Sequence, residues 1–214
     1  ELRRNARESI QIVIHDCEQG SETWFRIRMG MPTASEFATV MAAAKDGKER
    51  KTRNTYMRKL AGEIITGEPM ESYRNADMDR GKVMEAEARN FYAFTSNEVM
   101  QRVGFVTNGD RRGCSPDSLI GTSGMLEIKT AAPHILIEKI EADKFPPEHV
   151  AQCQGNLMVA EREYIDIAIY WPKMPMFVKR AYRDESFIYK MSAEIDAFNA
   201  ELHELVEKIR RYGA

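Results

Sequence analysis

The sequence predicts an α/β fold, with one central mixed β-sheet flanked by helices, and a single domain over residues 1–214. Length is the first reason, because 214 residues suit one domain with a sizeable core. Composition is the second, since 43% hydrophobic and 30% charged residues are values typical of globular proteins. The third is the order of the elements, in which segments with strand patterns stand between segments with helix patterns.

Helices dominate the first half of the predicted order. Gly30 and Gly67 are typical of helix ends, and Thr33 with Glu36 gives a capping-box pattern that opens a helix. An apolar stripe at helical spacing begins at Met84. The elements expected in this half are an apolar run at 10–14, helices at 21–30, 36–44, 54–65 and 75–94, and a strand at 99–106.

Strands and helices alternate in the second half. Asn108 with Gly109 indicates a turn, Pro133 starts a helix, and Pro172 and Pro175 separate two strand-like segments. The elements expected here are a hairpin within 115–129, helices at 133–142 and 148–160, strands at 164–171 and 176–182, and a final helix at 185–211.

Composition also excludes several classes of protein. The three cysteines are widely spaced and odd in number, which argues for reduced thiols and against a disulfide framework or a Cys/His zinc site. A net charge of -2 gives no general case for nucleic acid, so any DNA surface must be a local patch. No apolar run approaches the roughly 20 residues that span a bilayer. We therefore expect a soluble, intracellular protein with no membrane partner.

The central hairpin carries the residues of greatest chemical interest. Side chains alternate faces along a strand, so Glu127 and Lys129 point the same way. Asp117 falls opposite Glu127 on that face only if the connecting loop has an odd number of residues, such as Gly121-Thr122-Ser123. We therefore predict an odd loop or a bulge.

With that loop, two carboxylates and one ammonium group converge in a P-D…E-x-K arrangement. Hard oxygen ligands of this kind suit Mg²⁺ or Mn²⁺, and a neighbouring lysine can orient an attacking water. The alternative is that Asp117 closes a turn while Glu127 and Lys129 form the solvated face of an edge strand. Spacing alone does not decide between the two.

Two further stretches are candidates for binding phosphate. Ser35 falls in the first turn of the predicted helix, where free N–H groups favour an anion, and Arg28 lies a short loop earlier. The alternative is that Thr33 only caps the helix and Arg28 is solvated. A basic run with Tyr56 interleaved suits either a solvated helix start or contact with a nucleic-acid backbone. Its members are Lys48, Arg50, Lys51, Arg53, Arg58 and Lys59.

One more carboxylate could complete a metal site. Glu85 and Glu87 both lie on the helix expected at 75–94, beside its apolar stripe. A carboxylate at the edge of such a stripe is more often a surface group.

Five blocks of the sequence together resemble one known family. The blocks are Gln19-Gly20…Trp24…Arg28-Met29-Gly30…Thr33-Ala34-Ser35-Glu36, Gly81-Lys82…Glu85…Ala88-Arg89, Cys114-Ser115-Pro116-Asp117, Leu126-Glu127-Ile128-Lys129 and Ala151-Gln152-Cys153-Gln154. In this order they resemble the phage lambda exonuclease family, the alkaline exonucleases of viral recombination within the PD-(D/E)XK nucleases. The resemblance implies a restriction-endonuclease-like PD-(D/E)XK core. It also implies a phage- or prophage-encoded protein in the cytoplasm of a bacterial host cell.

The resemblance also implies an activity and its residues. It implies an Mg²⁺-dependent exonuclease that degrades one strand of linear duplex DNA from a 5′-phosphate end, releases 5′-mononucleotides and leaves 3′ single-stranded tails. Two Mg²⁺ ions, with Mn²⁺ as a substitute, would be bound by Asp117, Glu127, Glu85 and the carbonyl of Ile128. Catalysis would further involve Lys129 on the attacking water and Gln152 as support, and the 5′-phosphate would be bound by Arg28, Ser35 and Ser115.

Family members form ring-shaped trimers around DNA and work with a single-strand annealing protein, so both are expected here. The sequence departs from the family pattern where Thr130-Ala131-Ala132-Pro133 replaces Cys-Pro and where His149 stands at an aromatic position. Two alternatives to an exonuclease remain: a PD-(D/E)XK endonuclease, and a non-catalytic DNA-binding scaffold for recombination.

Overall fold

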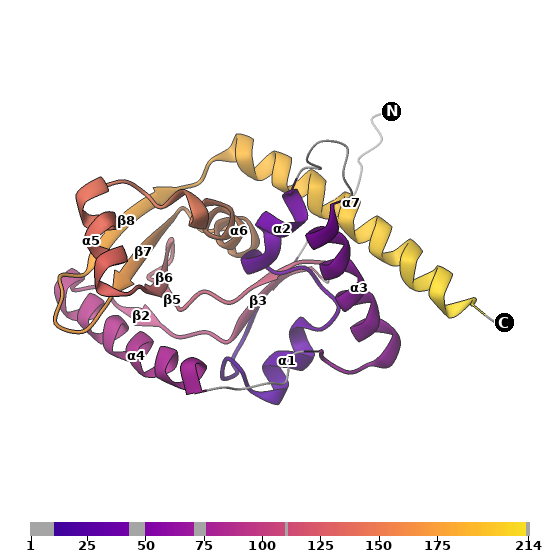
Figure 1. The fold of residues 1–214 in the computed structure, drawn as a ribbon, viewed down its shortest axis with the longest axis horizontal. Coiled ribbons are helices and arrows are strands. Elements are labelled where there is room, and N and C mark those ends of the chain that lie inside the picture. The colour runs from indigo at the N-terminus through magenta and orange to yellow at the C-terminus, as the bar shows by residue number, and fades with distance from the viewer. Residues whose placement is uncertain (1–10, 43–49, 71–75, 110, 213–214) are drawn as a thin grey trace, which may run out of the picture.

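The structure is a computed structural model that describes residues 11–42, 50–70, 76–109 and 111–212 (Figure 1). Its helices are α1 (Glu22–Arg28), α2 (Phe37–Met41), α3 (Lys51–Thr66), α4 (Ala76–Ser96), α5 (Pro133–Ala142), α6 (Val150–Ala160) and α7 (Glu185–Arg210), with short 3₁₀ helices η1 (Ala34–Glu36) and η2 (Pro147–His149). Its strands are β1 (Ile12–His15), β2 (Met100–Gln101), β3 (Phe105–Asn108), β4 (Gly113–Cys114), β5 (Ser118–Ile120), β6 (Gly124–Thr130), β7 (Tyr164–Tyr170) and β8 (Phe177–Tyr182).

The five-stranded sheet is the mixed sheet that the sequence predicts. Its strand order is β2-β5-β6-β7-β8, and only the β6–β7 pair is parallel. Parallel neighbours need a crossover, which here runs through α5 and α6. The α/β prediction is therefore confirmed. A second, antiparallel sheet of order β1-β3-β4 was not predicted.

The two faces of the large sheet have different partners. Leu126 and Ile128 pack with Ala88 and Tyr92 of α4 on one face. Residues of opposite parity face the other way. Met125 on that second face joins the main core, which includes much of α6. Glu127 and Lys129 share the parity of Met125, so they project toward the α6 side.

Helix α6 lies at the centre of the molecule (Figure 1). It contacts β3, β4 and β7, as well as η1, α2 and α7. Every residue from Cys153 to Ala160 is buried, because neighbours cover this part of α6 on all sides. The long helix α7 lies along α3 and α2 and closes the same core from outside (Figure 1).

The single strand predicted at 99–106 is wrong, because the chain turns within it. Residues Met100–Gln101 pair with β5, whereas Phe105–Asn108 pairs with β1 in the other sheet. Gly104 marks the turn: its N–H donates to the His15 carbonyl at 3.2 Å, and a Cβ there would lie 2.2 Å from the Cys17 carbonyl oxygen. Only glycine permits so close an approach of the two backbones.

The helix predicted at 36–44 is also different. A 3₁₀ turn comes first, α2 ends at Met41, and residues 43 and 44 lie outside the described residues. The capping box does not form, because the Thr33 side chain makes no capping hydrogen bond. Its hydroxyl is instead 3.4 Å from Arg28 Nη2 and 3.2 Å from Ser35 Oγ.

The helix predicted at 133–142 is found with these bounds, and the other predicted elements have shifted ends. Residues 10 and 75, where two predicted elements begin, lie outside the described residues. The helix predicted at 54–65 begins earlier, at Lys51, and ends at Gly67 in the left-handed region as expected. The segment predicted as a helix from residue 148 opens with η2. Cys17, Cys114 and Cys153 are free thiols. None of the helices that the structure describes has the length and apolar character that crossing a membrane would require.

Candidate active site

The central hairpin has the register that loop parity predicts. Ile120 pairs with Gly124 and Ser118 with Leu126, so the loop consists of the three residues 121–123. One step further along this register, Asp117 stands opposite Glu127. The Asp117 N–H donates to the Leu126 carbonyl at 3.1 Å, and Asp117 Oδ2 accepts from the Ile128 N–H at 2.5 Å. The first carboxylate of the site is thus fixed against the backbone of β6.

The second carboxylate, Glu127, is held by three side chains. Its Oε1 accepts from Gln152 Nε2 at 2.6 Å and is 2.8 Å from Lys129 Nζ. Its Oε2 accepts from Asn156 Nδ2 at 3.0 Å. Gln152 and Asn156 both project from α6. Since Glu127 is only 3% exposed, these contacts compensate for the water that its charge has lost.

The electrostatics of the site favour a bound cation. Burial, and then the charges of Glu127 and Glu85, raise the pKa of Asp117 well above its ordinary value. Burial opposes the charge on Lys129, but Glu127 outweighs it, so the Lys129 pKa lies above its ordinary value. A divalent cation between the carboxylates would relieve the repulsion that raises the Asp117 pKa.

Glu85 approaches from α4, on the opposite side of the sheet from α6. It is paired with Arg89 one turn along the helix, through Oε1. Its charge is among those that act on Asp117. Glu87 is exposed on the same helix, and it contributes, after burial, to the raised pKa of the Tyr170 hydroxyl instead. Of the two glutamates considered, Glu85 is the one associated with the acidic centre.

The donor set is suitable for Mg²⁺. Asp117, Glu127 and the backbone at Ile128 offer hard oxygen ligands. Within the described ranges, no group of three or more His, Cys, Asp or Glu side chains is placed to hold a metal ion. Mg²⁺ needs no such group, because it is usually bound by one or two carboxylates and keeps several waters. The residues present therefore fit one such ion, and a second ion would have to share Glu85 with Arg89.

The three residues predicted to bind a 5′-phosphate are brought together by their neighbours. The Arg28 guanidinium lies 4.1 Å above the Trp24 ring and 3.4 Å from Thr33 Oγ1, which in turn contacts Ser35. Trp24 Nε1 donates to Ser115 Oγ at 2.8 Å. Trp24 and Thr33 thus connect Arg28, Ser35 and Ser115 into one polar cluster. Ser115 is separated from Asp117 by a single residue, so the cluster adjoins the carboxylates.

The basic run of α3 has in part a structural explanation. Arg53 is buried and binds Glu201 of α7 through two hydrogen bonds of 2.6 and 2.8 Å. Arg50 also faces α7, 3.6 Å from Glu194. Lys48 lies outside the described residues. For Arg53 the interpretation as a DNA-binding residue is therefore wrong, because its charge is used inside the fold.

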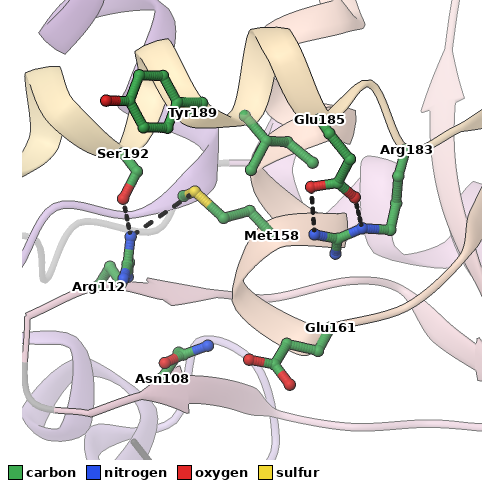
Figure 2. A pocket seen from close by; sticks show the side chains of 9 residues that line it. Asn108, Arg112, Met158, Glu161, Arg183, Glu185, Tyr189 and Ser192 are labelled. Atoms are coloured by element: carbon green, nitrogen blue, oxygen red, sulfur yellow. Dashed lines mark hydrogen bonds and ion pairs between the residues drawn. The ribbon is translucent and has the colours of Figure 1, made fainter. Parts of the chain in front are cut away.

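A separate cavity of about 660 Å³ lies at the C-terminal end of α6 (Figure 2). Both of its arginines have partners: Arg183 pairs with Glu185 at 2.6 Å, and Arg112 donates to Ser192 Oγ at 2.8 Å. None of the predicted site residues lines it. The cavity thus adds nothing to the chemistry of the hairpin.

Three supporting residues were not assigned a role from the sequence. Asn156 binds Glu127, Arg89 binds Glu85, and Gln19 donates to the carbonyls of Val103 and Pro116, both at 3.1 Å. Helical spacing could have indicated the first two, because residues four apart share a face of a helix. No local signal indicates the contacts of Gln19, whose partners lie 84 and 97 residues away.

The mixed sheet, the acidic pair and the E-x-K lysine together define a nuclease core of the PD-(D/E)XK class. A family model described as the YqaJ-like viral recombinase domain matches residues 23–163. The chain therefore belongs to the YqaJ-like viral recombinase family, which places it among the exonucleases of viral recombination. This confirms the predicted family resemblance.

Solved structures agree with this membership. The alkaline exonuclease LHK-Exo of Laribacter hongkongensis, solved alone and in complex with dAMP, matches at a TM-score of 0.80 and 33% sequence identity. The match covers 90% of this chain and 97% of LHK-Exo. A phage-related exonuclease from Haemophilus somnus shares the fold at a TM-score of 0.62 and 12% identity, covering 84% of this chain and 96% of that one. Among curated proteins no sequence matches the chain.

Proposed function

We propose that this protein is an Mg²⁺-dependent 5′-to-3′ exonuclease that acts on linear double-stranded DNA, releases 5′-mononucleotides and leaves 3′ single-stranded tails. One observation carries the proposal: Ser115 of the polar cluster and Asp117 of the acidic centre are separated only by Pro116. A 5′-phosphate bound by the cluster would hold a nearby phosphodiester over the carboxylates. The site would then measure its cut from the end of a strand.

Each predicted residue has a role in this scheme. Asp117, Glu127 and the Ile128 carbonyl would hold one ion, and Glu85 together with Asp117 a second. When bound, Mg²⁺ supplies Lewis-acid stabilisation of the phosphate and helps to activate water, with Mn²⁺ as a substitute. Lys129 would orient the attacking water, since its ammonium group lies beside Glu127.

Gln152 would keep the Glu127 carboxylate in its orientation during the reaction. Its amide donates to Glu127 Oε1, the oxygen that Lys129 also contacts. The polar cluster would bind the terminal phosphate through the guanidinium of Arg28 and the hydroxyls of Ser35 and Ser115. Arg28 is prepared for this role because the Trp24 ring already orients its guanidinium.

The wider setting of the reaction is proposed from the family. The complex of LHK-Exo with dAMP supports a mononucleotide product. The resemblance supports a homotrimeric ring around the DNA, and a single-strand annealing protein that takes up the 3′ tail for phage-type recombination.

Hydrolysis of matched DNA substrates tests the proposal. With Mg²⁺, linear duplex with 5′-phosphate ends should release mononucleotides faster than duplex with 5′-hydroxyl ends, and a closed circle should stay intact. Lys129→Ala should reduce the rate by about 10²- to 10⁴-fold, the usual contribution of a group that directs proton transfer. Cutting of the circle would instead indicate the endonuclease, and DNA binding without any cutting would indicate the scaffold.

A further inference from the structure

A continuous chain of hydrogen bonds joins the Glu85 side chain on α4 to the backbone carbonyl of Asp117, the residue before β5. Arg89 Nη2 donates to Glu85 Oε1, and Arg89 Nε donates to Ser118 Oγ at 3.2 Å. Ser118 Oγ in turn donates to the Asp117 carbonyl at 2.6 Å. The Glu85 carboxylate and the backbone carbonyl of Asp117 therefore belong to different elements but are connected through two intervening side chains.

This connection is buried and directional. The Arg89 side chain is 10% exposed and Ser118 is fully buried, so water does not compete for either group. Arg89 uses two different nitrogens of its planar fork, which fixes the direction in which it holds Glu85. Its contact with Glu85 is through Oε1. Glu85 Oε2 can therefore still serve as a ligand while Arg89 holds the other oxygen.

Helix α4 has a separate attachment to the sheet. The Tyr92 hydroxyl donates to the buried Asp166 carboxylate, and Arg180 binds that carboxylate through two bonds of 2.8 Å. Ala88 and Tyr92 add apolar contacts with β6. Because these contacts keep α4 in place, a change at Arg89 would alter the direction of Glu85 more than the position of the helix.

We propose that Arg89 is a positioning residue for the metal centre. Through its hydrogen bond to Ser118, Arg89 sets the position of Glu85 relative to Asp117 and thereby the affinity of the site for divalent cations. This inference rests on the proposed function, since that proposal makes Glu85 and Asp117 metal ligands. The inference adds Arg89 and Ser118 to the predicted site, as residues that contact the proposed metal ligands Glu85 and Asp117. Residues of this kind typically change metal affinity by about 10- to 100-fold when they are lost.

Calorimetric titration of the DNA-free protein with Mn²⁺ tests the proposal without using activity. Arg89→Lys keeps the positive charge but loses the fork, and Ser118→Ala removes only one hydroxyl. Both variants should bind Mn²⁺ about 10- to 100-fold more weakly than the parent protein. In the hydrolysis assay, the Mg²⁺ concentration for half-maximal rate should rise while the KM for DNA stays unchanged.

Arg53→Lys is the matched control, because Arg53 is also a buried arginine bound to a glutamate but lies in the α3–α7 packing. It should lower the melting temperature and leave Mn²⁺ affinity unchanged. The proposal is overturned if Arg89→Lys and Ser118→Ala bind Mn²⁺ like the parent, if Arg53→Lys weakens binding as much as they do, or if the parent binds no Mn²⁺. Failure of the proposed function would give a different result: the parent protein would bind Mn²⁺ but would not hydrolyse linear duplex DNA.

Discussion

Replacing Gly155 with alanine tests the packing that joins the two halves of the site. Gly155 lies on α6 next to Asn156, which holds Glu127. A Cβ at Gly155 would lie 2.5 Å from Phe37 Cδ2 and 3.2 Å from Ala34 Cβ. Both neighbours are fully buried and flank the turn that carries Ser35. The added methyl group would therefore separate α6 from the segment that we propose to bind the 5′-phosphate.

A second glycine allows the size of this effect to be isolated. Gly62 lies inside α3, and a Cβ there would meet nothing within 4 Å. Alanine at either position gains about 0.4–1 kcal/mol, because it is the better helix former and restricts the unfolded chain. Only Gly155→Ala also overpacks the core, which costs about 1–3 kcal/mol. The free energies of unfolding of the two variants should therefore differ by about 1–3 kcal/mol.

Thermal unfolding measures this difference. For a domain of this size, each kcal/mol corresponds to about 2–4 °C in melting temperature. Gly62→Ala should melt above the parent protein, and Gly155→Ala well below Gly62→Ala. The Gly155 variant should also hydrolyse 5′-phosphate ends more slowly, since both Asn156 and Ser35 lie next to the clash. If both variants gain stability alike, the close packing of α6 on Phe37 is refuted.

Three further changes give independent tests. Asn156→Ala removes a hydrogen bond to the buried Glu127 carboxylate. The free energy of unfolding, measured with urea, should fall by about 1.5–3 kcal/mol, and the Mg²⁺-dependent rate of hydrolysis should fall by about 10- to 100-fold. If both quantities stay unchanged, Asn156 does not support Glu127. Burial, and next the charge of Glu127, raise the pKa of Asp117 above the value of about 3.9 in an unfolded chain. As the pH rises, the unfolded chain therefore loses this proton first, and the folded protein loses stability until the pH has passed the raised pKa. Metal-free Asp117→Asn should thus unfold at higher urea concentration than the parent at pH 7 and lose that advantage below about pH 4, and an equal advantage at both pH values would contradict this account. Arg53→Ala loses two hydrogen bonds to Glu201, so its free energy of unfolding should fall by about 1.5–3 kcal/mol while its affinity for duplex DNA stays unchanged. Weaker DNA binding at equal stability would instead support contact between Arg53 and the DNA backbone.

The central hairpin could be predicted because its geometry is local. The period of two along a strand places Glu127 and Lys129 on one face whatever the rest of the chain does. The parity of the loop then requires Asp117 to stand opposite Glu127, and the observed pairing of Ser118 with Leu126 agrees. Given an odd loop, the geometry depends only on the hairpin itself, whereas its interpretation as a metal site needed the five blocks of the sequence together.

Other expectations failed because their outcome depended on distant residues. The strand predicted at 99–106 has a suitable composition, but Gly104 meets the backbone near Cys17, and this contact divides the segment between two sheets. Arg53 looks like its basic neighbours in the sequence. Its role differs because it binds Glu201, which lies 148 residues further along the chain. Composition within a window carries no information about such partners.

The supporting residues of the site lie between these two cases. Arg89 follows Glu85 by four residues and Asn156 follows Gln152 by four, so each is one helical turn from a residue that the sequence identified. Helical spacing places them on the same face, but it does not tell whether that face is turned to solvent or to a second carboxylate. The deciding contacts, with Ser118 for Arg89 and with Glu127 for Asn156, arise only when the helices pack on the hairpin from its two sides. A polar residue one turn from a predicted site residue, on a helix that packs against β6, is therefore a rational candidate for holding a site carboxylate in place. The Arg89 and Asn156 variants test that rule on opposite faces of the sheet.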